Sequence, residues 1–147
     1  MRIKVARIGL ALLGFLGLAF IRFCESELFY DPLLAFFKTA YQGKALPDLV
    51  LGKYLIHVAL RFGANMIFSL LIIWAFFKDN GILRVTLVLY CLCLVILIVV
   101  LGIMLVNITD GQSYLSLFYI RRFLIQPLLL FLLIPAFYYY LKTQTKS

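Results

Sequence analysis

The sequence predicts an all-α integral membrane protein with four transmembrane helices and a short interfacial helix between the first and second. Hydrophobic side chains make up 65% of the 147 residues, 14% are charged, and the mean hydropathy is +1.09. A soluble domain of this size could not bury so much apolar surface. Four apolar stretches are each long enough to cross a ~30 Å hydrocarbon core. Short polar turns separate them, so we treat 1–147 as one four-span domain.

The first expected span covers residues 5–23. Basic residues precede it as they do in a signal peptide, but no small-residue cleavage site follows, so we predict an uncleaved helix. Its glycines at Gly9, Gly14 and Gly17 should let another helix approach closely.

A short helix over 32–42 is expected to lie in the membrane interface, because it is too short to span and has an aromatic-rich apolar side. Asp31 and Pro32 provide an N-cap and a first-turn proline, and Gly43 provides a stop. The alternative is a re-entrant helix or an ordinary buried loop helix.

The second expected span, 49–77, carries a polar stripe. Five polar residues recur every four positions along it: Lys53, His57, Arg61, Asn65 and Ser69. Successive members are displaced by only ~40° around a helix, so the stripe winds slowly along one side. We interpret Lys53 as an interfacial anchor, and Arg61 and Asn65 as polar contacts to another helix.

The third expected span, 82–106, is almost featureless, and a polar turn at 110–113 follows it. The three cysteines, Cys24, Cys91 and Cys93, show no metal-binding spacing. We therefore expect no metal site and no cofactor.

The fourth expected span, 115–141, contains the least usual sequence for a membrane helix. Arg121 and Arg122 stand about one turn inside its start, and Gln126 and Pro127 follow one turn later. Because ionisable residues are costly in a membrane span, such a pair faces other protein, a cavity or the lipid headgroups.

The distribution of basic residues predicts the orientation. Of the fourteen Lys and Arg residues, seven lie on the same expected side of the membrane as the two termini: Arg2, Lys4, Arg7, Lys78, Arg84, Lys142 and Lys146. Three lie in the loops on the opposite side: Lys38, Lys44 and Lys53. This bias predicts cytoplasmic N- and C-termini. The net charge of +8 lies in short loops and helix ends, so we expect no nucleic-acid binding.

With this orientation, a set of polar residues should meet in the outer leaflet as a partner-binding or anion-binding site: Arg22, His57, Arg61, Asn65, Arg121, Arg122 and Gln126. In particular, the arginines of the second and fourth spans should share one site if an acid between Glu25 and Asp31, or an external anion, lies between them. The anion could be a phospholipid headgroup, a polyisoprenyl phosphate or a partner's carboxylate. The alternative is mutual pairing that serves assembly alone.

Two segments carry a family resemblance: ELFYDPLLAFFK (Glu27 to Lys38) and FYIRRFLIQPLLLFLLIPAFYY (Phe118 to Tyr139). With the four-span layout, they resemble the exosortase F system-associated membrane protein family over most of the chain, most specifically in the Arg-Arg-Phe-Leu-Ile-Gln-Pro run. The resemblance implies a bacterial inner-membrane protein that accompanies exosortase F, a membrane cysteine transpeptidase linked to C-terminal sorting signals.

The exosortase would itself supply a catalytic cysteine, histidine and arginine. We therefore expect no catalytic residue here, and predict an accessory or regulatory subunit that contacts the transpeptidase or its substrate, with membrane lipids as its other partners. The alternatives are an envelope lipid- or polyprenyl-phosphate-binding protein and, with less support, a thiol enzyme that uses Cys24, His57 and an arginine.

Overall fold

The computed structural model describes residues 2–108 and 114–145, and all regular structure in these two ranges is helical. In chain order the helices are α1 (Arg2–Phe23), α2 (Glu25–Leu28), α3 (Pro32–Lys38), α4 (Leu51–Phe77), α5 (Asn80–Asn107), α6 (Leu115–Ile125) and α7 (Leu128–Gln144). The predicted all-α class is confirmed. The turn expected at 110–113 lies outside the described residues.

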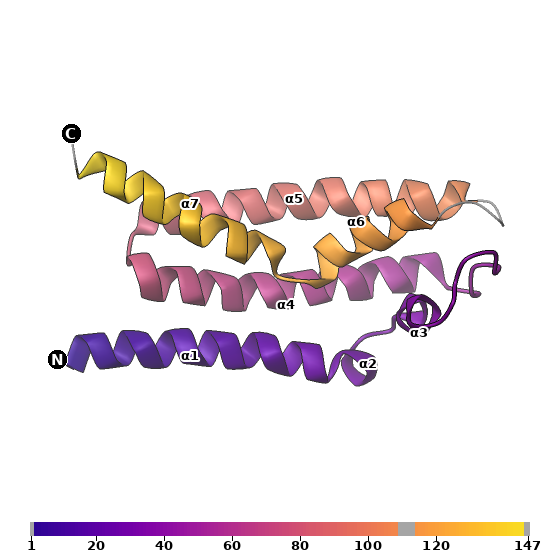
Figure 1. The fold of residues 1–147 in the computed structure, drawn as a ribbon, viewed down its shortest axis with the longest axis horizontal. Coiled ribbons are helices and arrows are strands. Elements are labelled where there is room, and N and C mark those ends of the chain that lie inside the picture. Colours follow the sequence, from indigo (N-terminus) through magenta and orange to yellow (C-terminus); the bar gives the residue numbers. More distant parts are fainter. Residues whose placement is uncertain (1, 109–113, 146–147) are drawn as a thin grey trace.

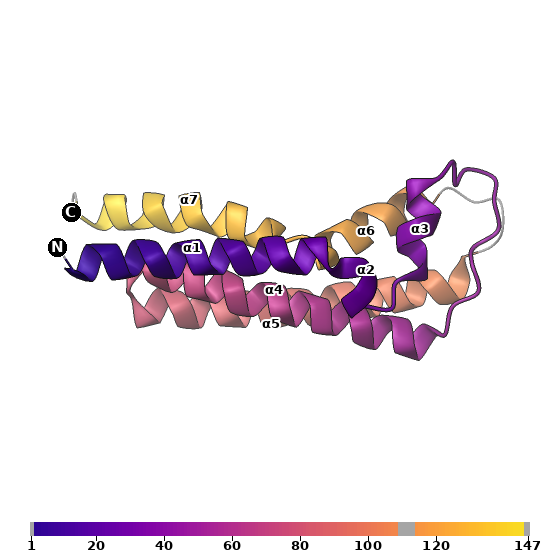
Figure 2. The ribbon, with the colours of Figure 1, turned by 90° about the horizontal axis from the view of Figure 1, so that it is seen from below.

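The long helices lie side by side in an elongated bundle (Figures 1 and 2). Helix α4 is central, because α1, α5 and α6 all pack against it. The start of α1, the end of α7 and the turn between α4 and α5 lie at one end, which we call the terminal end (Figure 1). Helices α2 and α3 and the first turns of α6 lie toward the opposite end, which we call the loop end (Figure 2).

Three helices of the described chain, α1, α4 and α5, are long and apolar enough to cross a membrane. Helices α6 and α7 add a fourth crossing if the bent pair is counted as one span. The fold class is therefore shown as helical and membrane-compatible, with three or four candidate spans.

The stretch expected to form one helix over 115–141 is divided into α6 and α7, whose axes differ by 63°. Pro127 lies at the break, where it has no N–H to donate and its ring clashes with the preceding turn. The Gln126 N–H still bonds the Arg122 carbonyl at 3.1 Å, so α6 ends with a closed turn. Pro135, by contrast, lies inside continuous α7.

Glycines allow α1 to pack closely on α4, as expected for two of the three. A Cβ atom at Gly14 or Gly17 would overlap Ile72 or Phe68 of α4, whereas nothing lies within 4 Å of one placed at Gly9. The contact therefore depends on small residues in the second half of α1.

Helix α3 is shorter than predicted, because it ends at Lys38 instead of continuing to residue 42. It packs on the first turns of α6 through edge-to-face aromatic pairs, with Phe36 5.5 Å from Tyr114 and Phe37 5.4 Å from Phe118 between ring centroids. These contacts place the second half of α3 beside the start of α6.

Candidate functional site

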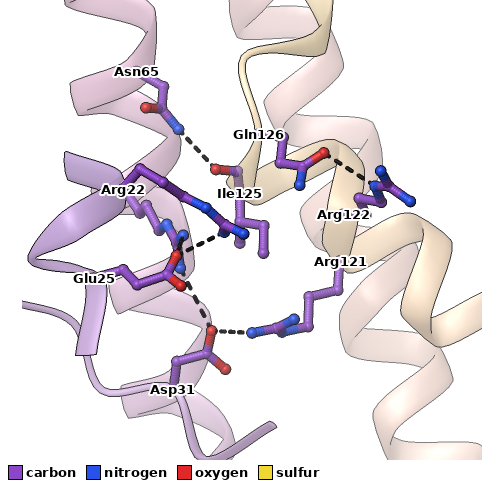
Figure 3. Close-up of polar contacts among 9 residues, drawn as sticks. Arg22, Glu25, Asp31, Asn65, Arg121, Arg122, Ile125 and Gln126 are labelled. Atoms are coloured by element: carbon purple, nitrogen blue, oxygen red, sulfur yellow. Dashed lines mark hydrogen bonds and ion pairs between the residues drawn. The ribbon is translucent and has the colours of Figure 1, made fainter. Parts of the chain in front are cut away.

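A chain of ion pairs connects α1, α2, the start of α3, α4 and α6 (Figure 3). Arg22 Nη1 lies 2.9 Å from Glu25 Oε2, and Arg61 Nη2 pairs with the same carboxylate oxygen. Arg61 Nη1 lies 3.7 Å from Asp31 Oδ2, which also accepts a hydrogen bond from Arg121 Nη2. We call these five residues the arginine network.

Most of the arginine network is buried. Arg61 is 1% exposed and Arg121 4% exposed, and the side chains of Asp31 and Glu25 are 4% and 9% exposed. These four groups carry two positive and two negative charges, so the buried part is neutral. Arg22 differs, because its side chain is 57% exposed. A balanced group of this kind can remain buried, whereas loss of one partner would leave an uncompensated charge.

Asp31 shows why the pairing could not be read from local sequence. Its position before Pro32 predicts a side-chain N-cap for α3, but its side chain makes no capping hydrogen bond. The carboxylate instead turns toward Arg61 and Arg121. Asp31 is thus the N-cap residue of α3 as predicted, but its side chain does not cap the helix, because two buried guanidinium groups are stronger partners than a backbone N–H.

The position of Arg61 along α4 indicates where the network would lie in a bilayer. Arg61 is ~24 Å from the end of α4 at Phe77, at 1.5 Å per residue. Since the hydrocarbon core is ~30 Å thick, a bilayer whose other boundary is at Phe77 would place the network close to the headgroups. Buried arginines cost less there than at the bilayer centre.

The predicted arginine site is brought together in part. Arg61 and Arg121 meet at Asp31, one of the acids that we expected to lie between them. Arg122 is separate: its Nε donates to Gln126 Oε1 at 3.0 Å on the exposed surface of α6 (Figure 3). Adjacent residues on a helix point ~100° apart, so only one of the two arginines can face α4.

Asn65 and His57 have other partners. Asn65 Nδ2 donates to the Ile125 carbonyl at 3.0 Å, where the break leaves that oxygen without a helical partner (Figure 3). His57 Nδ1 accepts the Tyr30 N–H at 3.2 Å, and Lys53 Nζ lies 4.5 Å from the centroid of the Tyr30 ring. His57 and Lys53 therefore hold the segment that leads to Asp31, and Asn65 holds the α6–α7 break.

Two clefts adjoin the network. The first, which we call the cationic cleft, has a volume of about 270 Å³, and its polar lining is Arg22, Lys38, Arg121, Arg122 and Gln126. The second, which we call the apolar cleft, has a volume of about 300 Å³ and lies between α1, α4 and the α6–α7 break. Its walls include Phe15, Leu18, Leu128 and Phe131, and its polar groups are Arg22, Arg61, Asn65 and Gln126.

Lys38 is the lining residue that sequence reasoning missed. We counted it as a loop charge, although its place at the end of a short aromatic helix was a usable signal. The aromatic side of α3 packs on α6, and this contact brings Lys38 to the same cleft as Arg122. Neither of these two cations is ion-paired with an acid in the described part of the chain.

Within residues 2–108 and 114–145, no group of three or more His, Cys, Asp or Glu side chains is arranged to hold a metal ion. Cys24, Cys91 and Cys93 are free thiols. The chemistry that the cationic cleft can offer is charge-assisted hydrogen bonding to an anion.

Comparison with known proteins gives no further identification: no protein-family model, no curated protein and no solved structure matches the chain. We therefore infer the function from the residues of the site.

Proposed function

We propose that this chain is a non-catalytic accessory or regulatory membrane subunit that holds an anionic group of a partner at the cationic cleft. The observation that carries the proposal is the unequal pairing of its cations. Arg61 and Arg121 are neutralised within the fold, whereas Lys38 and Arg122 are exposed and pair with no described acid. Open cations held on a rigid frame are suited to an external carboxylate or phosphate.

The buried arginines have a different role in this proposal. They join α2, α4 and α6 and so fix the walls of the cleft. In this proposal Arg61 and Arg121 serve the assembly of the fold. The residues that bind the anionic group are Arg22, Lys38 and Arg122. Gln126 supports binding by orienting the Arg122 guanidinium.

The family resemblance supplies the proposed setting. In it the partner is an exosortase F-type transpeptidase or its substrate, in a bacterial inner membrane with both termini in the cytoplasm. The cationic cleft then lies on the outer side, where a sorting signal would be processed.

Copurification from native membranes tests the proposal. A tagged Lys38→Gln/Arg122→Gln variant should retain less than about a tenth of the transpeptidase held by the wild type, because both open cations are lost. The matched control is Lys4→Gln/Lys142→Gln, which removes two cations from the terminal end. Equal recovery of the transpeptidase by the wild type and both variants would contradict the proposal.

A specific observation favours a second candidate function, the binding of an envelope lipid or polyprenyl phosphate. The apolar cleft shares lining residues with the cationic cleft, which is the pairing of surfaces that an amphiphile requires. The thiol-enzyme alternative gains no such support, because His57 Nδ1 already accepts a backbone hydrogen bond. A Cys24→Ser variant with normal abundance should therefore support sorting at the wild-type level.

A further inference from the structure

We propose that the cationic and apolar clefts form one site for a lipid that ends in a phosphomonoester. The phosphate contacts Arg22, Lys38 and Arg122, and a hydrocarbon chain occupies the apolar cleft. This inference rests on the proposed function in one respect, namely that the cationic cleft binds an anionic group. It identifies that group as the phosphate of a lipid.

The two clefts meet at three residues. Arg22, Ile125 and Gln126 line both of them, so the two clefts share this part of their walls. Arg22 is largely exposed, and Gln126 is held by its hydrogen bond from Arg122. A single ligand can therefore contact both clefts past the end of α1.

The clefts also follow one another in the order that an amphiphile in a membrane requires. The cationic cleft includes Lys38 and Phe118, which belong to the elements of the loop end. The apolar cleft includes Phe15 of α1 and Phe131 of α7, and these two helices run to the terminal end. A phosphate at the membrane boundary would thus have its chain directed toward the hydrocarbon core.

The charge of the cationic cleft favours a phosphomonoester over a phosphodiester. Lys38 and Arg122 pair with no described acid, and Arg22 has only the Glu25 oxygen that it shares with Arg61. A phosphomonoester carries a charge of about −1.5 to −2 near neutral pH, whereas a phosphodiester carries about −1. Two unpaired cations therefore neutralise a monoester, and they leave an excess positive charge on a diester.

The experiment measures lipid binding to the purified full chain by native mass spectrometry in detergent. The probes are phosphatidic acid, phosphatidylglycerol and phosphatidylcholine with the same acyl chains. We expect phosphatidic acid to bind ~10-fold more tightly than phosphatidylglycerol, and phosphatidylcholine to bind more weakly still. Similar affinities for all three would mean ordinary surface lipid and would overturn the inference.

Variants test each half of the site separately. Lys38→Gln/Arg122→Gln should abolish the preference for phosphatidic acid, whereas Lys4→Gln/Lys142→Gln should keep it. Ala19→Trp places a large side chain in the apolar cleft and should weaken long-chain phosphatidic acid ~10-fold while binding of inorganic phosphate is unchanged. Ala11→Trp is its control, because Ala11 lines a different cleft with Lys4 and Arg7.

The outcomes distinguish three claims: that the lipid phosphate binds in the cationic cleft, that its hydrocarbon chain occupies the apolar cleft, and that the proposed function is correct. Unchanged binding of long-chain phosphatidic acid by Ala19→Trp, with wild-type thermal stability, would overturn the assignment of the apolar cleft. Strong competition by inorganic phosphate at the lipid's own concentration would show a free-phosphate site and would also overturn it. If lipid selectivity is absent but copurification of the transpeptidase still needs Lys38 and Arg122, this inference fails and the proposed function stands.

Discussion

Asp31 is the residue on which the buried charges converge. One of its carboxylate oxygens faces both Arg61 and Arg121, and its side chain is 4% exposed. Because the two guanidinium groups belong to α4 and α6, the carboxylate links two helices that are far apart in sequence. Without its negative charge, Arg121 would have no acidic partner among the described residues, and Arg61 would keep only the Glu25 carboxylate, which Arg22 also contacts.

Replacing Asp31 with Asn should therefore lower the free energy of unfolding by about 3–5 kcal/mol, although the side chain keeps its size. Thermal unfolding of the purified variant in detergent measures the effect. Asp48→Asn is the control, since Asp48 is exposed and takes no part in the ion pairs of the described residues. Similar losses in the two variants would show that the network does not hold the helices together.

The sequence predicted which polar residues face another helix better than it predicted which residues they contact. Its four-residue spacing predicted that Arg61 and Asn65 would face another helix, and both are buried. Local sequence cannot choose between Arg121 and Arg122, because either could face α4 after a rotation of α6 by ~100°. The choice depends on where Asp31 lies in space, and that position is set by the packing of α3.

At the scale of elements, the least predictable feature is the break between α6 and α7. Proline is tolerated within membrane helices when a neighbour satisfies the freed backbone groups, so Pro127 alone does not reveal a 63° bend. Asn65 supplies that neighbour by donating to the Ile125 carbonyl. The break therefore depends on a contact between residues 60 positions apart. The sequence of one span cannot predict such a contact.

The contact between α1 and α4 was easier to predict, and it gives a test of the helix packing. A Cβ atom at Gly14 would lie 2.5 Å from Ile72 Cγ1, and Ile72 is fully buried, so α1 must shift to accept a side chain. Gly14→Val should lower the stability by about 1–3 kcal/mol in thermal unfolding. Gly9→Val, which meets nothing within 4 Å, should leave the unfolding midpoint near that of the wild type. A midpoint for Gly14→Val equal to that of Gly9→Val would argue against the close packing.

At the scale of the whole molecule, the positions of the two ends bear on the number of membrane crossings. Both described termini lie at the terminal end, together with the turn between α4 and α5 (Figure 1). An even number of crossings would give this placement, and α1, α4 and α5 are three candidate spans. We therefore predict that the bent pair α6 and α7 acts as a fourth, although neither helix alone passes as a span. If the pair were re-entrant, the end of α7 would return to the loop-end side.

Reporter fusions distinguish these arrangements, and the basic residues predict the answer. Lys4, Arg7 and Lys142 are at the terminal end with Lys78, so we expect that end to be cytoplasmic. An alkaline phosphatase reporter should be inactive after Lys78 and after the last residue, and active near Gly43; a fluorescent reporter should give the opposite pattern. Phosphatase activity both near Gly43 and after the last residue, with none after Lys78, would make α6 and α7 a re-entrant pair with three crossings. Inactive phosphatase near Gly43, with activity after Lys78, would invert the whole protein and place the cationic cleft on the cytoplasmic side, away from an outer-leaflet lipid or partner.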